Sequence, residues 1–325
     1  MMAGTLINDA ELGQVQASIV LLGSDAANLA AAFRDRYPNI DLRFSDQLGD
    51  ASDIEAAVCW RPPTGILGGL TNLRLIQSSG AGVDHLLADP ELPPEVTVCR
   101  ASDDDMGRGM AAYVCWAVVS HQRQLDDYAD DRELKSWHQR PVRSTATHTV
   151  GILGTGNLGS VCAQALTTLG YPVRGWRRRS SRPAPHFSSL FQGREELESF
   201  LRDCHCLVCL LPLASSTRGF LSSSLFAHLQ DGTHLINVGR GEHLIEADLF
   251  DALSAGSIAA ATLDTFIQEP LPREHPFWGE PRIRITPHIA TRCTPASVAD
   301  QTLRNLLSIR NGRKPQQAVD PLTAQ

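Results

Sequence analysis

The chain has 325 residues, enough for about two domains of ordinary size. Apolar residues make up 42% of it, charged residues 20%, and the mean hydropathy is −0.14, which excludes disordered, collagen-like and coiled-coil proteins. Its 29 basic residues are outnumbered by 36 acidic ones, and the net charge of −7 provides no overall positive field for a phosphate backbone. We therefore expect no nucleic-acid partner.

Three features bear on membranes and cell compartment. The longest apolar run of helical type, residues 110–119, is about half the roughly 20 residues that a membrane span needs. The N-terminus lacks the basic and then apolar segments of a secretory signal. The eight cysteines lie mostly inside apolar runs, which does not suit a secreted disulfide scaffold. We expect no membrane partner, a cytoplasmic location and reduced, buried thiols.

The first part of the chain alternates short apolar runs with a helical pattern. We predict strands at 18–24, 40–45, 56–60 and 73–77, and a helix at 26–37. The last two strands lead into turns that contain Pro62-Pro63 and SSGAGVD (78–84). Residues 103–132 then carry apolar side chains at helical spacing, which predicts one long helix.

A second alternating series begins after Pro141. HTVGILGTGNLG (148–159) is typical of a strand that enters a glycine turn and then a helix at 157–169. Further strands are predicted at 171–176, 205–213, 233–240, 260–266 and 282–289, with a loop at 177–189. Strands that alternate with helices predict an α/β fold with a parallel, doubly wound sheet.

The glycine turn at 154–159 has the GxGxxG spacing of dinucleotide-binding proteins. The motif alone is weak, but here it follows a strand and opens a helix, so the backbone can approach a pyrophosphate and the helix N-terminus can bind it. The alternative is an ordinary strand-to-helix turn. The expected cofactor contacts in this turn are Gly154, Thr155, Gly156, Asn157, Leu158 and Gly159.

NAD-binding versions of the motif carry an acidic residue about 20 positions later, where it binds the ribose 2′-hydroxyl. This chain has Arg177, Arg178 and Arg179 there, and no carboxylate appears before Glu195. Arginines suit a 2′-phosphate, so NADP(H) is the preferred cofactor and NAD(H) a possible one. A solvated basic loop is the alternative.

Two further groups of polar residues are expected to be structural. Cys206 and Cys209 have a spacing seen in metal sites, but a strand would direct them to opposite faces, so we expect no metal. His243 and Glu246 are spaced for one face of a helix, and without an HExxH motif a solvated helix face explains them best.

Three later segments each place a chemically able residue at a strand end. They carry Arg240, Glu269 and His288. Each could singly be a surface or structural residue. Because parallel strands present their carboxyl ends at one crevice, the three can instead converge on a cofactor.

Several segments together resemble the D-isomer-specific 2-hydroxyacid dehydrogenases over most of the chain, from about residue 56 to 299. They are SSGAGVD, GILGTGNLG, LLPLASSTRGFL, INVGRGEHLIEADL, LDTFIQEPLP, HPFW and TPHIA. CWRPP, GAGVD and LDDYADDRELKSWHQRP are most similar to the glyoxylate/hydroxypyruvate reductase A branch, in which a histidine is usual where this chain has Arg61.

The resemblance implies two α/β domains. A Rossmann dinucleotide-binding domain, residues 103–288, would be inserted into a flavodoxin-like substrate domain formed by 1–102 and 289–325. It also implies a homodimer, because residues 135–148 match the dimer arm of the family.

The resemblance assigns catalysis to Arg240, Glu269 and His288. Hydride transfer to a keto carbon leaves negative charge on oxygen, so His288 would supply a proton, Glu269 would favour its charged form, and Arg240 would hold the substrate and polarise its carbonyl group. Asp264 would hold the nicotinamide carboxamide. Other expected cofactor contacts are Leu211, Pro212, Val238 and Gly239, and other expected substrate contacts are Trp60, Arg61 and the N–H groups of Ala81 and Gly82.

The implied activity is reduction of a small 2-keto acid, such as glyoxylate or hydroxypyruvate, by NADPH. Two alternatives stay open from the sequence. One is a dehydrogenase of a bulkier 2-keto acid, since pocket volume depends on packing. The other is a nucleotide-responsive binding protein like the corepressors that share this fold.

Overall fold

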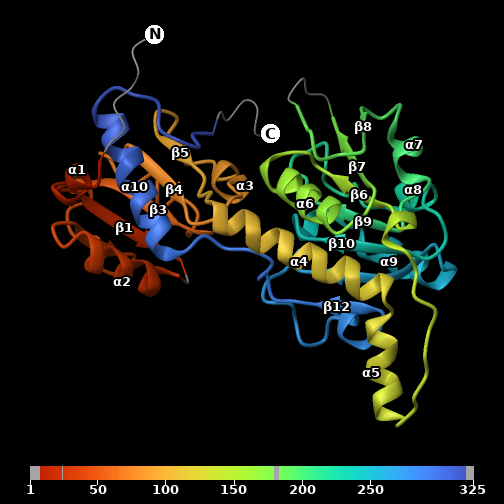
Figure 1. Cartoon of the computed structure of the whole chain (residues 1–325). Coiled ribbons are helices and arrows are strands. Elements are labelled where there is room, and N and C mark those ends of the chain that lie inside the picture. Colours follow the sequence, from red (N-terminus) through yellow and green to blue (C-terminus); the bar gives the residue numbers. More distant parts are fainter. Residues whose placement is uncertain (1–7, 24, 179–182, 320–325) are drawn as a thin grey trace. The chain divides into compact units, whose positions relative to one another are not determined.

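The computed structural model describes residues 8–23, 25–178 and 183–319, which form two compact units (Figure 1). Unit 1 contains the described residues up to Asp105 and from Arg292 onward, and unit 2 is Met106–Thr291. The sequence placed these boundaries a few residues earlier, at 102/103 and 288/289. Within the described residues, no helix is both long and apolar enough to span a membrane.

Unit 1 is built on a five-stranded sheet in the order β2-β1-β3-β4-β5, with every neighbouring pair parallel. This is the flavodoxin-like strand order that the resemblance implied. The strands are β1 (Ser18–Leu22), β2 (Asp41–Phe44), β3 (Ile54–Cys59), β4 (Leu75–Ser78) and β5 (Thr97–Cys99). The helices are α1 (Asp9–Gly13), α2 (Ala26–Arg36), α3 (Asp84–Leu87) and α10 (Pro295–Arg310).

Unit 2 contains a seven-stranded parallel sheet in the order β12-β11-β10-β9-β6-β7-β8. The order reverses direction at β6 and β9, as in the Rossmann fold, and the predicted doubly wound α/β class is confirmed. Its strands are β6 (Val150–Leu153), β7 (Val173–Arg177), β8 (Ser189–Gln192), β9 (Cys206–Cys209), β10 (Thr233–Asn237), β11 (Ile258–Leu263) and β12 (Ile283–Ile285).

The helices of unit 2 correct the prediction of one long helix at 103–132. The chain forms two helices separated by Arg123 and Gln124, and Gln124 adopts a left-handed φ of 54°. The buried face of the first ends at Gln122, and the second has no buried side chain, so no packing holds the two in line. The helices are α4 (Asp104–Gln122), α5 (Leu125–Glu133), α6 (Asn157–Thr168), α7 (Leu197–Leu201), α8 (Ser223–Phe226) and α9 (Glu246–Ala255).

A second correction concerns the predicted loop at 177–189. Arg177 is the last residue of β7, and Ser189 already begins the edge strand β8, which the sequence analysis did not identify. The partly polar segment SLFQ has little apolar alternation, so its pairing with β7 depends on the neighbouring strand rather than on a local pattern.

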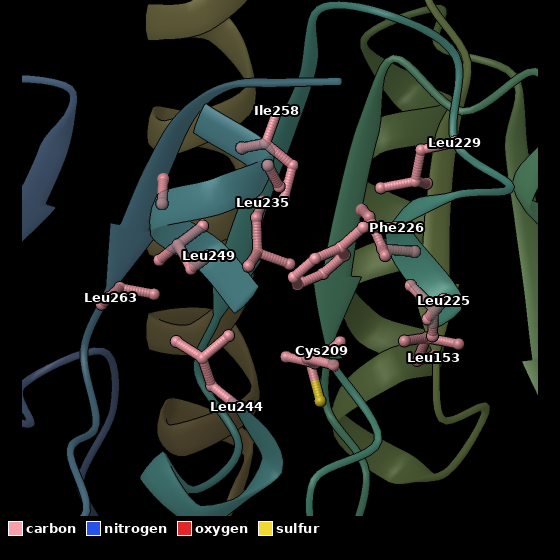
Figure 2. Close-up of a cluster of buried hydrophobic side chains, with 14 of the residues drawn as sticks. Leu153, Cys209, Leu225, Phe226, Leu229, Leu235, Leu244, Leu249, Ile258 and Leu263 are labelled. Carbon is pink, nitrogen blue, oxygen red and sulfur yellow. The ribbon is translucent and has the colours of Figure 1, made fainter. Parts of the chain in front are cut away.

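Two hydrophobic clusters pack on the two faces of the sheet in unit 2. Figure 2 shows part of one, in which Phe226 and Leu235 pack near Cys209. Cys206 belongs to the other cluster, so the two thiols lie on opposite faces, as the strand alternation predicted. All eight cysteines are free, and in the described part of the chain no three His, Cys, Asp or Glu side chains are grouped to hold a metal.

Four histidines gather at the amino ends of β6, β9 and β10. The rings of His121 and His234 are 4.7 Å apart between centroids, and those of His148 and His205 are 4.8 Å apart. The His205 Nδ1 accepts a hydrogen bond from the Thr149 N–H at 3.2 Å. Burial, assisted by the neighbouring positive groups, lowers the pKa of His121 to about 4 and that of His148 to about 3.

This cluster predicts acid sensitivity. Unfolded histidines titrate near pH 6.5, above the folded-state pKa of His148, so the unfolded chain binds more protons and stability falls as the pH falls below about 6.5. We expect a loss of about 1 to 2 kcal/mol for each of His121 and His148 between pH 7 and pH 5. The free energy of unfolding, measured with urea at both pH values, should fall less in His148→Gln than in the wild type. It should fall by the wild-type amount in His228→Gln, whose ring is exposed. An equal loss of unfolding free energy in all three proteins would contradict the acid sensitivity predicted for His148.

Candidate active site at the carboxyl ends of the unit 2 strands

The turn between β6 and α6 forms a cradle for a phosphate group. Gly154 has a φ of 106°, and a Cβ there would lie 2.7 Å from the Leu210 carbonyl oxygen. A Cβ on Gly159 would lie 2.0 Å from the Gly154 carbonyl oxygen, so the helix starts this close to the turn only because both residues are glycine. Gly156 caps α6 without a side-chain hydrogen bond and, like Asn157, is exposed. The cradle therefore fits the pyrophosphate of a dinucleotide at a helix N-terminus.

The end of β7 fits the expected basic site. Arg177 ends the strand, and the exposed Arg178 donates from Nη1 to Ser216 Oγ at 3.0 Å. Arg179 lies outside the described residues. Ser216, in the loop after β9, was not identified from the sequence, because nothing local marks it as a neighbour of residue 178. A hydroxyl and guanidinium groups form a donor set that suits a phosphate monoester.

The loop after β10 fixes the backbone of Arg240. The Asn237 side chain donates to the Arg240 carbonyl oxygen at 2.9 Å and accepts from the Gly239 N–H at 3.3 Å. The Arg240 N–H donates to His243 Nδ1 at 3.0 Å, and the guanidinium donates to the Gly239 carbonyl oxygen at 2.7 Å.

His243 corrects the expectation of a solvated helix face. It is fully buried in a short 3-10 turn, and its Nε2 lies 3.4 Å from the Pro212 carbonyl oxygen. Because Nδ1 accepts the Arg240 N–H, Nε2 carries the proton and joins the loops after β9 and β10. Glu246 instead lies 3.1 Å from His275 Nε2.

Glu269 and His288 form a hydrogen-bonded pair. Glu269 Oε2 lies 3.0 Å from His288 Nδ1, and Oε1 accepts the Phe266 N–H at 3.0 Å. Because a carboxylate can only accept, Nδ1 bears a proton, and Nε2 is the ring nitrogen that is directed away from Glu269. His288 is held with a left-handed φ of 55°, which is uncommon for a residue other than glycine.

Asp264 is almost completely buried at the end of β11. Its Oδ1 accepts from Thr286 Oγ1 at 2.6 Å and from the Ile289 N–H at 2.8 Å, and its Oδ2 accepts the Ala290 N–H at 2.9 Å. These charge-assisted bonds offset the cost of burying the carboxylate. Asp264 therefore binds its own chain, and Oδ2 can accept a second hydrogen bond of the kind expected for a carboxamide.

The structure brings the expected loops of unit 2 together. A Cβ on Gly241 would lie 2.0 Å from the Phe266 carbonyl carbon, so the Arg240 and Glu269 loops are in close contact. The Asp264 and His288 loops are joined by the hydrogen bonds above. Leu211, Pro212, Val238 and Gly239 lie in the loops directly after β9 and β10, at the same edge of the sheet.

The expected substrate contacts of unit 1 lie at the ends of β3 and β4. The Trp60 ring lies 4.5 Å from His85, between centroids, and packs so closely on Gly80 that a Cβ there would be 2.7 Å from it. Arg61 is exposed, with a φ of 47°. Ser78 Oγ accepts the Gly80 N–H at 3.2 Å and donates to the Gly82 carbonyl oxygen at 2.9 Å, so it holds the turn that follows β4.

Comparisons with known proteins agree with this arrangement. The family model for the NAD-binding domain of D-isomer-specific 2-hydroxyacid dehydrogenases matches residues 115–290. A glyoxylate/hydroxypyruvate reductase A from Serratia proteamaculans is 39% identical over 303 residues, which cover 92% of this chain and 96% of that protein.

Two solved structures are similar over nearly their whole length. A D-isomer-specific 2-hydroxyacid dehydrogenase from Xanthobacter autotrophicus Py2, in complex with NADPH and MES, is 35% identical with a TM-score of 0.89, covering 96% of this chain and 100% of that one. An NADPH-dependent glyoxylate/hydroxypyruvate reductase from Sinorhizobium meliloti, in complex with NADP and sulfate, is 29% identical with a TM-score of 0.89, covering 95% and 100%. With the dinucleotide cradle and the residues assembled beside it, these matches confirm the resemblance seen in the sequence: the chain belongs to the D-isomer-specific 2-hydroxyacid dehydrogenase family, a family of oxidoreductases.

Proposed function

We propose that this protein reduces small 2-keto acids, glyoxylate and hydroxypyruvate among them, with NADPH as the preferred cofactor and NADH as a weaker one. The observation that carries the proposal is the Glu269–His288 pair, 3.0 Å between Oε2 and Nδ1, beside the Arg240 loop and the dinucleotide cradle. The relatives named above support the choice of substrates and of cofactor, and the Arg177–Arg178 end of β7 supports a 2′-phosphate.

The catalytic roles follow from the donors and acceptors of this chain. Bound NADPH would supply the hydride. Glu269 holds Nδ1 of His288 and stabilises the imidazolium, so Nε2 can give its proton to the carbonyl oxygen as charge develops there. Arg240 always carries its charge and offers a planar set of donors, which suits the carboxylate and carbonyl oxygens of a 2-keto acid. In the oxidative direction, neutral His288 would act as the base.

Unit 1 would bind the substrate carboxylate. The N–H groups of Ala81 and Gly82 donate to no other described residue, and Ser78 holds the turn that carries them. Backbone N–H groups in a turn are good anion donors. Trp60 would limit the size of the substrate side chain, and Arg61 would add a positive charge nearby.

We also propose a homodimer formed through the segment that follows α4. In Figure 1, α5 and the chain after it project from unit 2. This segment exposes Leu134, Trp137 and Val142, with Trp137 fully exposed. Arg140 braces it through an ion pair with Asp131 and by stacking on Tyr128. Exposed apolar side chains on a braced arm suit burial against a second copy. The cytoplasmic location stays a prediction.

The cofactor preference can be tested at the end of β7. Arg177→Asp would remove a positive charge from the phosphate site and place an acid where a ribose hydroxyl binds, so we expect kcat/KM with NADPH to fall about 10-fold or more and that with NADH to rise. Arg202→Asp is the matched control, because Arg202 is 66% exposed and pairs only at the surface with Glu198. A wild-type protein with higher kcat/KM for NADH would overturn the preference.

The substrate class can be tested with a panel of 2-keto acids assayed with NADPH. We expect kcat/KM for glyoxylate and hydroxypyruvate to exceed that for branched and aromatic acids by about 10-fold or more, since rejection of extra methylene groups is worth 10-fold upward. Preference for a bulky acid would support a different dehydrogenase. NADPH binding without turnover of any acid would support a nucleotide-responsive binding protein.

The proton donor is tested by His288→Ala and Glu269→Gln. His288→Ala should lower kcat by about 10²- to 10⁴-fold while NADPH binding, followed by fluorescence, survives. Glu269→Gln keeps the ring but removes the carboxylate that holds Nδ1, so kcat should fall as well, by a smaller factor than in His288→Ala. The two effects should not add, because both residues serve one proton transfer. Near-normal turnover by both His288→Ala and Glu269→Gln would leave the pair without a role.

A further inference from the structure

A chain of hydroxyl groups leads from helix α4 to the loop that carries His288. The Tyr113 hydroxyl lies 2.5 Å from Thr286 Oγ1, and Thr286 Oγ1 lies 2.6 Å from Asp264 Oδ1. Tyr113 is separated from Thr286 by 173 positions in the sequence, so no local motif indicates the contact. All three residues belong to unit 2.

The donor direction along this chain is fixed. A carboxylate can only accept, so the single hydroxyl proton of Thr286 is directed to Asp264. Thr286 must then accept, and Tyr113 must donate. Burial raises the pKa of Tyr113 to about 12, so its hydroxyl keeps the proton that it donates. The order of donation is thus Tyr113 to Thr286 to Asp264.

Asp264, which accepts the Thr286 hydroxyl, is also hydrogen-bonded to the backbone around His288. Its carboxylate accepts the N–H groups of Ile289 and Ala290, and its carbonyl oxygen accepts the His288 N–H at 2.9 Å. These bonds hold His288 in its left-handed conformation, which is strained for a residue other than glycine and persists only where the surroundings enforce it. Glu269 orients the ring, and Asp264 holds the backbone to which the ring is attached.

The Tyr113 ring also contacts Trp116 on the same helix. It packs edge-on against Trp116 at 5.3 Å between centroids, and the Arg284 guanidinium lies 4.5 Å from the centre of the Trp116 ring. Arg284 also forms an ion pair with Asp126 on α5. The Tyr113 ring therefore has a contact on α4 in addition to the hydrogen bond that its hydroxyl makes to Thr286.

We infer that Tyr113 and Thr286 are positioning residues for proton transfer, which keep the Asp264 carboxylate and the His288 backbone in the geometry that aims the imidazole at the substrate oxygen. The inference rests on the proposed function, in which His288 is the acid. Neither residue touches the reacting atoms in this role. Their effect is expected on the proton-transfer step rather than on substrate affinity.

The experiment measures kcat, KM and the solvent deuterium isotope effect on kcat for Tyr113→Phe, Thr286→Val and Thr286→Ser. Loss of one hydrogen bond in the chain should lower kcat about 3- to 5-fold in Tyr113→Phe and about 10-fold or more in Thr286→Val. The isotope effect should rise in both variants, because proton transfer becomes slower relative to the other steps. KM should change less than 2-fold or so, and Thr286→Ser, which retains the hydroxyl, should restore most of kcat.

A double variant and a matched control separate positioning from general damage. Tyr113→Phe added to Thr286→Val should lower kcat no further, because the first bond acts only through the second. Tyr171→Phe is the control: this buried tyrosine also bonds to α4, through Gln122 Oε1 at 2.8 Å, but lies outside the chain of hydroxyls. We expect its kcat and isotope effect to match the wild type. If Thr286→Val does not fold, as judged by thermal unfolding, Tyr113→Phe against Tyr171→Phe carries the test.

The outcomes distinguish this inference from the proposed function. If His288→Ala is severely impaired but Tyr113→Phe and Thr286→Val keep wild-type kcat and isotope effects, the positioning role is wrong and the proton donor stands. If His288→Ala itself turns over normally, the proposed function fails. Equal impairment of Tyr113→Phe and Tyr171→Phe would also overturn the inference, since it would show a loss common to any buried tyrosine hydroxyl.

Discussion

The parallel arrangement of all seven strands in unit 2 is the constraint on which the rest of the site depends. Because every strand runs in the same direction, every carboxyl end lies at one edge, and the loops that follow β6, β9, β10, β11 and β12 meet there. This parallel arrangement is enough to bring together the glycine cradle, Arg240, Asp264 and His288. The requirements at this edge are local: small residues where loops touch, and acceptors for the buried backbone N–H groups.

Two carboxylates at this edge have different tasks, which their surroundings decide. Asp264 is buried and accepts three hydrogen bonds from its own unit, so its charge serves to hold a loop. Glu269 accepts one backbone N–H and the His288 ring, so its charge serves an ionisable partner. A buried carboxylate is tolerated only when its oxygens are satisfied, and here that satisfaction also imposes a strained backbone on the residue proposed to carry the proton.

The opposite ends of the same strands carry a contrasting group. His148, His205 and His234 lie where β6, β9 and β10 begin, and burial keeps them neutral rather than charged. One residue type therefore has two roles in unit 2. Glu269 lies 3.0 Å from Nδ1 of His288, whereas burial, assisted by the neighbouring rings, lowers the pKa of His148 and of His234 in the cluster.

The sequence by itself determined the features that depend on local pattern. Alternation of strands and helices gave the fold class, GILGTGNLG gave the cradle, and the segments around Arg240, Glu269 and His288 gave the candidate site, because periodicity and motif spacing are properties of neighbouring residues. Only the tertiary structure decided what depends on distant residues. It ended the first helix before Gln124, buried His243 against the Pro212 carbonyl oxygen, placed Ser216 beside Arg178 and joined Tyr113 to Thr286. Each of these is a contact between groups far apart in the chain or a loss of packing on one face, and neither leaves a periodic trace in the sequence.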